Sequence, residues 1–270
     1  MRNNKESQGY GGKGRPGGPR DDAAGEEDGP ILLYGSHAVE AALANPARVV
    51  LNLWLTENAE RRLAEVVAAR GIAAERVLPR ELDRRLGPDT VHQGAMVEVE
   101  PLPDVTLEEL APLADGGRPV ILLDQVTDPH NVGAVFRSAA AFGAAGMVLT
   151  RRHSPPLAGT LGKAASGALD ALPIALVGNL SRAIAALKDL DFTVIGLDGE
   201  GPTRLEDEPL TSRIAIVLGA EGRGLRQLTR DTCSRICRLH TDGPLASLNV
   251  SNAAAVTLHH LALVRHRAAG

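Results

Sequence analysis

The feature that most constrains the fold is a regular alternation of short apolar runs with helical segments from Pro119 onward. The helical segments cover about 132–143, 157–168, 181–190 and 249–267, and the apolar runs between them are VILLDQV (120–126), GMVLT (146–150), PIALV (173–177), FTVIGLD (192–198), RIAIVLG (213–219) and RICRL (235–239). Near-continuous apolar strands joined by helices are typical of a parallel sheet covered on both faces. We therefore predict an α/β fold whose ligands bind outside the carboxyl ends of the strands, in the loops after Val126, Leu197, Leu218 and Leu239.

The composition excludes several classes of protein. The 270 residues are 44% hydrophobic, which is enough for a sizeable core, but they include only one Trp, two Tyr and three Phe. Such scarcity argues against a protein that binds single strands by stacking bases on aromatic side chains. No apolar run approaches the roughly 18 to 20 residues of a membrane span, the N-terminus lacks the apolar stretch of a signal peptide, and two cysteines cannot build a disulfide framework. We expect a soluble, cytoplasmic protein.

The chain before the alternating region divides into three parts. Residues 1–28 are rich in glycine and charge and are predicted to be disordered. Residues 30–101 have the pattern of a small α/β unit, in which Ser36 caps a helix that ends at Asn45, 48–55 form a strand, Thr56 caps a helix that ends at Gly71, and a half-buried strand follows Gly94. Residues 102–118 and the preceding Pro101 contain three prolines and a Gly-Gly pair. Residues 102–118 are therefore predicted to be a linker, or a loosely packed connection, to a domain over 119–268.

The loop after Val126 leads into a helix that carries one conspicuous cation. Asn131 is placed to cap this helix, and Gly133 allows another group to approach its first turn. Arg137 lies nearly two turns in, among Ala, Val and Phe. It can extend to solvent or pair with a carboxylate; alternatively, it contacts a phosphate or a ribose at a helix start that favours anions.

Two later loops gather glycine and small polar residues. The segment LGAEGRGL (218–225) places Glu221 among three glycines. A carboxylate at this place makes the loop a poor phosphate-binding site and suits a cationic or hydroxyl-rich ligand better. Alternatively, the glycines form a plain strand-to-helix turn. At the start of the final helix stand Ser247, Asn249, Ser251 and Asn252, of which only one is needed as a cap.

Other candidate motifs are incomplete. Gly12, Gly14 and Gly17 spell GxGxxG, but no strand precedes them and no helix follows. Cys233 and Cys237 have no second pair of ligands nearby, so we predict no metal site. Residues 162–163 lack the rest of a P-loop, and the adjacent His259 and His260 point apart on a helix.

Three segments together resemble the successive motifs of the SpoU (TrmH-type) RNA 2′-O-ribose methyltransferases. They are DPHNVGAVFRSA (128–139), IVLGAEGRGL (216–225) and PLASLNVSNAAA (244–255), in the order of the family and at the ends of the expected strands. The resemblance continues through 153–174, and LYGSHAVEAAL (33–43) and VHQGAMVEVEPL (91–102) are similar to the small L30e-like RNA substrate-binding domain of many members. It covers about residues 30–268.

The resemblance implies a fold, a cofactor and a set of site residues. It implies an α/β fold with a parallel sheet and a C-terminal deep trefoil knot (the SPOUT fold), an exception to normal topology that periodicity does not predict. It implies a homodimer that binds S-adenosylmethionine, largely through backbone groups at Leu197, Gly219, Leu239 and Leu248. The catalytic residues carried over are Asn131, Arg137, Glu221, Ser247 and Asn249.

The implied activity is S-adenosylmethionine-dependent 2′-O-methylation of a ribose. The most similar members methylate a guanosine ribose of 23S ribosomal RNA, so the expected partner is this RNA, either alone or in a pre-ribosomal particle. Transfer RNA is an alternative substrate, and a non-catalytic RNA-binding or ribosome-assembly protein of the same fold is an alternative function. A nucleotide-dependent oxidoreductase lacks its fingerprint here. The net charge of −4 neither requires nor excludes RNA, because residues 1–20 and 213–238 each carry an excess of four positive charges.

Overall fold

The computed structural model describes residues 29–209, 213–243 and 248–269. The predicted disordered tail, 1–28, lies outside the described residues, and so does Ser247. Within the described ranges, no helix combines the length and the apolar character that a membrane crossing requires.

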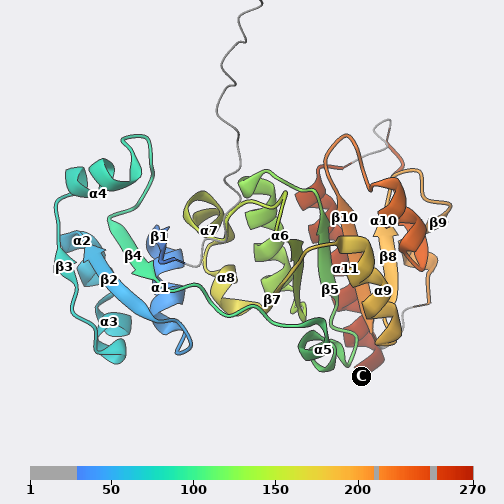
Figure 1. The fold of residues 1–270 in the computed structure, drawn as a ribbon, viewed down its shortest axis with the longest axis horizontal. Coiled ribbons are helices and arrows are strands. Elements are labelled where there is room, and N and C mark those ends of the chain that lie inside the picture. Colours follow the sequence, from blue (N-terminus) through green and yellow to red (C-terminus); the bar gives the residue numbers. More distant parts are fainter. Residues whose placement is uncertain (1–28, 210–212, 244–247, 270) are drawn as a thin grey trace, which may run out of the picture.

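The larger part of the molecule is built around a seven-stranded parallel sheet (Figure 1). Its strands, in spatial order, are β7 (Ile174–Val177), β6 (Gly146–Thr150), β5 (Val120–Asp124), β10 (Ile214–Gly219), β8 (Thr193–Leu197), β11 (Arg235–Arg238) and β9 (Thr203–Arg204). Every pairing in it is parallel. The α/β fold predicted from the apolar runs is confirmed, and β9 is a short edge strand that the hydropathy pattern did not mark.

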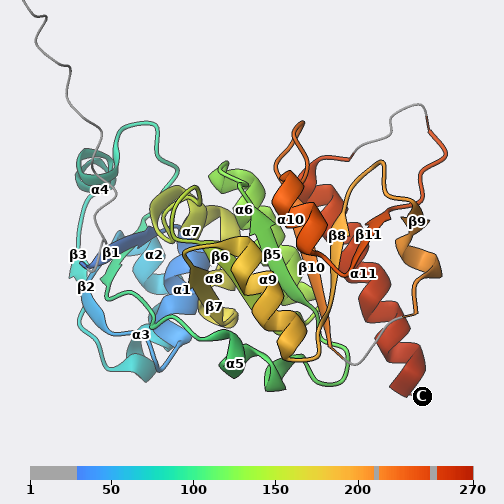
Figure 2. The ribbon, with the colours of Figure 1, turned by 45° about the vertical axis from the view of Figure 1, so that its right-hand side comes forward.

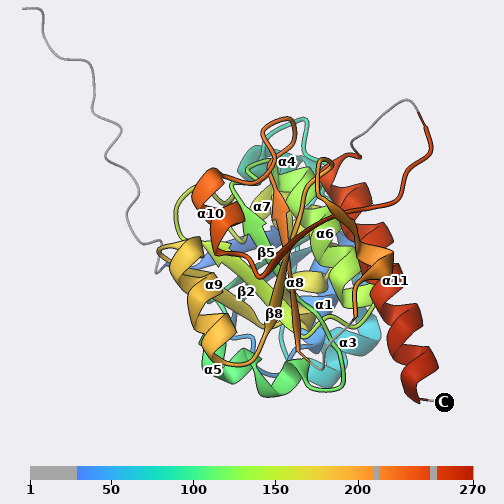
Figure 3. The same ribbon diagram turned by 90° about the vertical axis from the view of Figure 1, so that its right-hand side faces the viewer.

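The two faces of this sheet carry two separate cores because successive side chains of a strand point to opposite faces. Ile121 and Leu123 pack in one core, and Val120 and Leu122 pack in the other. Figure 3 shows α9 and α10 on one side of the sheet and α6 and α11 on the other. The helices of this part are α5 (Leu107–Leu110), α6 (Pro129–Ala141), α7 (Gly159–Ala165), α8 (Ala168–Ala171), α9 (Leu180–Asp189), α10 (Gln227–Thr232) and α11 (Val250–Ala269), with 3-10 turns at Pro112–Ala114 and Leu205–Asp207.

The N-terminal part is a second, smaller sheet beside the first (Figure 2). Its strand order is β1-β4-β2-β3, and β4 is antiparallel to both neighbours. Its elements are β1 (Ile31–Tyr34), α1 (Ser36–Ala44), β2 (Val50–Leu55), α2 (Glu57–Arg62), α3 (Ala64–Arg70), β3 (Glu75–Arg76), α4 (Pro79–Leu86) and β4 (Ala95–Val99). The small α/β unit expected from the sequence is present.

The two sheets share one continuous core. Leu33, Val97 and Phe136 belong to the same buried cluster. A buried ion pair joins the parts: Arg48 Nε lies 2.9 Å from Asp170 Oδ1, and the two side chains are only 3% and 4% exposed. A charge this deeply buried is tolerated because it is paired and hydrogen bonded, so the pair specifies one arrangement of the two parts.

The connection between the sheets is not loosely packed, contrary to expectation. It contains α5, whose Leu110 is fully buried, and Val105 donates a backbone hydrogen bond to Ile174 O at 3.0 Å. The prolines and glycines of this segment suggested a linker, but its leucines cover one face of the large sheet.

Three predicted helix starts also need correction. Thr56 and Ser36 form no side-chain cap; the Ser36 hydroxyl instead donates to Gln93 Oε1, and the helix after Thr56 is interrupted at Leu63 into α2 and α3. Helix α6 begins at Pro129, so its cap is Asp128, whose carboxylate accepts from His130 N at 3.1 Å. Asn131 therefore lies inside the first turn and is free for another role.

Candidate functional site

Three of the predicted catalytic residues meet at the carboxyl edge of the large sheet. Asn249 Nδ2 donates to Asn131 Oδ1 at 3.0 Å and lies 3.3 Å from Glu221 Oε2. These residues come from α6, from the loop after β10 and from the start of α11. Because parallel strands end at the same edge, residues separated by 118 positions become hydrogen-bonded neighbours.

Asn249 has a second role at the start of α11. Its Oδ1 accepts from Ser251 N at 2.9 Å, from Ser251 Oγ at 2.6 Å and from Asn252 N at 3.4 Å. It therefore satisfies backbone donors of the first turn, as an N-cap does. One amide both fixes the helix and positions Asn131 and Glu221.

The glycine loop after β10 is folded tightly over the strand end. A Cβ on Gly219 would lie 2.2 Å from Gly224 C, and Gly224 N donates to Ala220 O at 2.8 Å, so only glycine fits at 219. The buried Asp124 carboxylate at the end of β5 accepts from Arg226 N at 3.0 Å and from Arg226 Nε at 2.7 Å. These bonds hold the loop that carries Glu221.

Three of the four predicted cofactor residues lie side by side at the same edge. Leu218 is opposite Leu197, and Leu197 is opposite Cys237. Leu197 and Gly219 therefore end two adjacent strands, and Leu239 directly follows the end of β11 beside them. Leu197 and Leu239 are partly buried against the core, and Leu248 is 42% exposed near the start of α11. The partly buried leucines at these strand ends offer the apolar surface that an adenosine moiety needs.

Arg137 is not part of this cluster. It is exposed, and among the described residues it forms no hydrogen bond or ion pair. It lines a cavity of about 270 Å³ between the two sheets, together with residues of β1, α1 and α7. Gly133, on a further side of α6, meets helix α7: a Cβ there would lie 2.4 Å from Ala164 Cβ. The close approach that this glycine permits is therefore helix packing.

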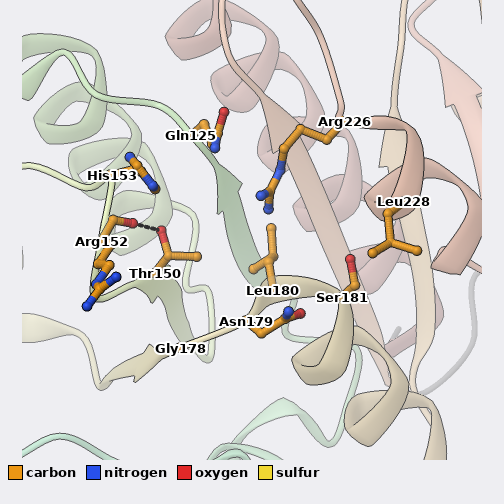
Figure 4. Close-up of a pocket in the computed structure, with 10 residues that line it drawn as sticks. All are labelled: Gln125, Thr150, Arg152, His153, Gly178, Asn179, Leu180, Ser181, Arg226 and Leu228. Carbon is orange, nitrogen blue, oxygen red and sulfur yellow. Dashed lines mark hydrogen bonds between the residues drawn. The ribbon is translucent and has the colours of Figure 1, made fainter.

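A second cavity, of about 210 Å³, lies at the carboxyl ends of β5, β6 and β7 (Figure 4). Arg152, His153 and Arg226 line it, with Asn179 and Ser181 at the start of α9. None of the predicted catalytic or cofactor residues that the structure describes lines it. Arg226 is already paired with Asp124, so its guanidinium serves the glycine loop.

Both cysteine thiols are held in their protonated form by burial. Burial raises the pKa of the Cys233 thiol to about 11, and burial also raises the pKa of the Cys237 thiol. In the described part of the chain, no three His, Cys, Asp or Glu residues are grouped as metal ligands.

Sequence reasoning missed two residues of the site. Asp124 stands within the apolar run 120–126, and an acidic residue that ends such a strand is itself a signal. Lys163 follows Gly162 in an incomplete P-loop pattern, and the structure places it in the same cavity as Arg137.

Comparison with known proteins agrees with this geometry. The model of the SpoU rRNA methylase family matches residues 118–259, and a model described as RNA 2′-O ribose methyltransferase substrate binding matches residues 32–105. The 23S rRNA (guanosine-2′-O-)-methyltransferase RlmB of Pseudomonas putida is 36% identical over 84% of this chain and 93% of its own. RlmB of Pseudomonas aeruginosa is 37% identical over 85% and 94%.

Solved structures show the same fold. The SpoU methyltransferase AviRb from Streptomyces viridochromogenes, in complex with its cofactor AdoMet, superposes with a TM-score of 0.75 at 23% identity, covering 94% of this chain and 95% of that one. The matched models, the full-length relatives and the cluster at the carboxyl edge lead to one conclusion. This chain belongs to the SpoU rRNA methylase family.

Proposed function

We propose that this chain transfers a methyl group from S-adenosylmethionine to the 2′-hydroxyl of a guanosine ribose in 23S ribosomal RNA. One observation carries the proposal: relatives named as 23S rRNA (guanosine-2′-O-)-methyltransferases align with nearly their whole length, at 36% and 37% identity. The substrate-binding and methylase regions both match, in that order.

The polar cluster supports an active enzyme over a non-catalytic RNA-binding protein. Asn249 donates to Asn131 Oδ1 at 3.0 Å and lies 3.3 Å from Glu221 Oε2, so it brings the three residues together. We assign these residues to the catalytic site, together with Ser247, which lies outside the described residues. A protein that only binds RNA needs Asn249 as the cap of α11, but it does not need the contacts of Asn249 with Asn131 and Glu221.

S-adenosylmethionine supplies the methyl group on a sulfonium. We propose that Leu197, Gly219, Leu239 and Leu248 hold it, largely through backbone groups at the ends of β8, β10 and β11. Transfer to a hydroxyl is an in-line displacement, in which positioning of the two reactants contributes much of the acceleration. The loop bonds of Asp124 serve this positioning by fixing Glu221 and the backbone after Gly219.

The attacking hydroxyl must lose its proton. A guanidinium stays protonated in proteins and is therefore a poor base. We assign to Arg137 the stabilisation of the developing alkoxide and of the adjacent phosphate, which its planar fork of donors can contact together. Water or the RNA phosphate then accepts the proton.

We further propose a C-terminal trefoil knot. Helix α11 packs against α6 and β10, whereas the preceding strand β11 lies beyond β8, so the chain recrosses the carboxyl edge. A Cβ on Gly201 would lie 2.5 Å from Cys237 C, so backbone segments pass one another here without intervening side chains. For residues 30–101 we retain the L30e-like assignment.

A homodimer is the proposed assembly. Helix α11 exposes Val256 (47%) and Leu263 (41%) with His259 between them, which is an apolar strip suited to a second copy. Sedimentation equilibrium on the purified chain tests it. Since the proposed substrate is ribosomal RNA, we also propose a cytoplasmic location and a pre-ribosomal particle as a partner.

The deciding experiment is transfer of tritiated methyl from S-adenosylmethionine to unmodified total RNA, followed by separation of 23S rRNA from tRNA and mapping of the modified ribose. The expected product is 2′-O-methylguanosine in 23S rRNA. Label in tRNA would retain the chemistry and overturn the substrate. Absence of both label and cofactor binding would overturn the methyltransferase assignment.

A further inference from the structure

The cavity beside Arg137 is built by both parts of the chain. Tyr34, His37 and Gln93 reach it from the N-terminal sheet, and Arg137, Thr160 and Lys163 reach it from α6 and α7. The two parts meet at its wall, where the Tyr34 and Thr160 hydroxyl oxygens lie 3.4 Å apart. The regions that match the substrate-binding and methylase models therefore share one cavity of about 270 Å³.

This cavity is positively charged. Arg137 and Lys163 both line it, and no Asp or Glu is among the described residues that line it. Neither cation forms an ion pair or hydrogen bond within the described part of the chain; Lys163 Nζ lies only near the Tyr34 ring, 6.0 Å from its centroid. Unpaired cations in a concave site attract an anion.

Lys163 is held in place by its aliphatic stem. A Cβ on Gly35 would lie 3.5 Å from Lys163 Cγ, so the stem runs along bare backbone, where φ of Gly35 is 92°. A stem packed in this way leaves the ammonium at the cavity while its carbons are covered.

Gln93 supplies a fixed neutral donor. Its Oε1 accepts from Ser36 N and from Ser36 Oγ, both at 3.0 Å, and these bonds leave Nε2 as a donor at the cavity. The backbone of Gln93 has a φ of +54°, an uncommon conformation for a residue other than glycine. Ser166, with a φ of +51°, lines the same cavity. Strained backbone of this kind persists where the surrounding structure holds it, commonly at binding sites.

We propose that this cavity binds a backbone phosphate of the substrate RNA next to the methylated nucleotide, with Lys163 and Gln93 as positioning residues beside Arg137. The inference rests on the proposed methyl transfer to RNA. A compact ammonium, an amide N–H and a guanidinium are complementary to the oxygens of one phosphodiester. The RNA is thereby held at the junction of the two parts of one chain, with its ribose beside Arg137.

The test is the salt dependence of binding to in vitro transcribed 23S rRNA by the full chain. Lys163→Met keeps the packed stem and removes the charge. We expect affinity to fall roughly tenfold, and the slope of log affinity against log salt to become shallower by about 0.7 to 0.9, the value for one phosphate contact. Lys188→Met is the matched control, since Lys188 is exposed on α9 and donates to Thr232 O; it should leave both quantities unchanged.

Kinetics separate positioning from a structural defect. For Lys163→Met, the KM for RNA should rise about tenfold while kcat at saturating RNA changes less than about twofold, and Lys163→Arg should restore the salt slope. Gln93→Glu keeps the acceptor for Ser36 but places a carboxylate at the cavity, so it should weaken RNA binding and leave cofactor affinity intact. An unchanged salt slope in Lys163→Met, or equal losses in Lys188→Met, would overturn the proposal. Absence of both methyl transfer and cofactor binding in the unaltered chain would overturn the proposed function instead, and the binding slopes would still test the cavity.

Discussion

Two sides of helix α6 have different surroundings, although one short sequence motif supplies both. On one side, Asn131 accepts a hydrogen bond from Asn249 at 3.0 Å, and Asn249 lies 3.3 Å from Glu221. On the other side, Arg137 is exposed and, among the described residues, has no hydrogen bond or ion pair. Residues six positions apart on a helix point in directions about 120° apart, so the motif places its polar side chains in two different surroundings.

The difference indicates which groups are set before the substrate arrives. The paired side is part of the fold, because Asn249 also caps α11. The unpaired side contributes little to the fold and remains available for an anionic ligand. Substitutions on the two sides should therefore separate effects on turnover from effects on stability.

The largest expected effect is that of Arg137→Ala. If the guanidinium stabilises the developing alkoxide, its loss should lower kcat by about 10²- to 10³-fold, as does the loss of one donor to an oxyanion. The free energy of unfolding should change by less than about 0.5 kcal/mol, since the side chain is exposed and unpaired. Single-turnover methyl transfer and urea denaturation measure the two quantities.

Two further variants sharpen this result. Arg137→Lys keeps the charge and lacks the planar fork, so turnover should stay low; near-normal turnover would contradict a role that depends on the fork. Arg182→Ala, at an exposed position of α9 outside the N-terminal part, is the matched control and should leave turnover unchanged.

A smaller effect is expected from Gly133→Ala, on the side of α6 that packs against α7. In a free helix this change would stabilise by about 1 kcal/mol. Here the new Cβ would lie 2.4 Å from Ala164 Cβ and 2.8 Å from Ala164 C, so we expect destabilisation by about 1 to 3 kcal/mol. Urea denaturation measures it, and adding Ala164→Gly should recover part of the loss. A more stable single variant would show that α6 and α7 are less tightly packed than the structure has them.

The main sheet was predictable because its strands are buried on both faces and read as apolar runs. The meeting of Asn131 with Asn249 followed from the rule that parallel strands end at one edge. Strand β9, by contrast, is two residues long and polar, so no hydropathy pattern marks it. The buried pair of Arg48 and Asp170 joins positions 122 apart, and nothing local in the sequence pairs them.

Local errors came from competition between neighbouring residues. Asn131 is a good capping residue, but Pro129 prefers the first helical position, which makes Asp128 the cap. The sequence alone does not show that the Ser36 hydroxyl bonds to Gln93 instead of capping the helix, because Gln93 is 57 positions away. The helical angle between Asn131 and Arg137 predicts that the two side chains point in different directions. The cavity that Arg137 lines could not be predicted in this way, because the N-terminal sheet forms part of its wall.

The smallest expected effect on stability separates the two functions of Asn249. Asn249→Ala removes the cap of α11 and should cost about 1 kcal/mol of stability, while also releasing Asn131 and Glu221. Asn249→Asp keeps a capping oxygen for Ser251 N and Asn252 N but loses the amide donor, and it places a second carboxylate near Glu221. We therefore expect the Asp variant to retain nearly the original Tm and to lose turnover as the Ala variant does. Equal stability losses in both variants would mean that the contact with Asn131, rather than the cap, holds α11 in place.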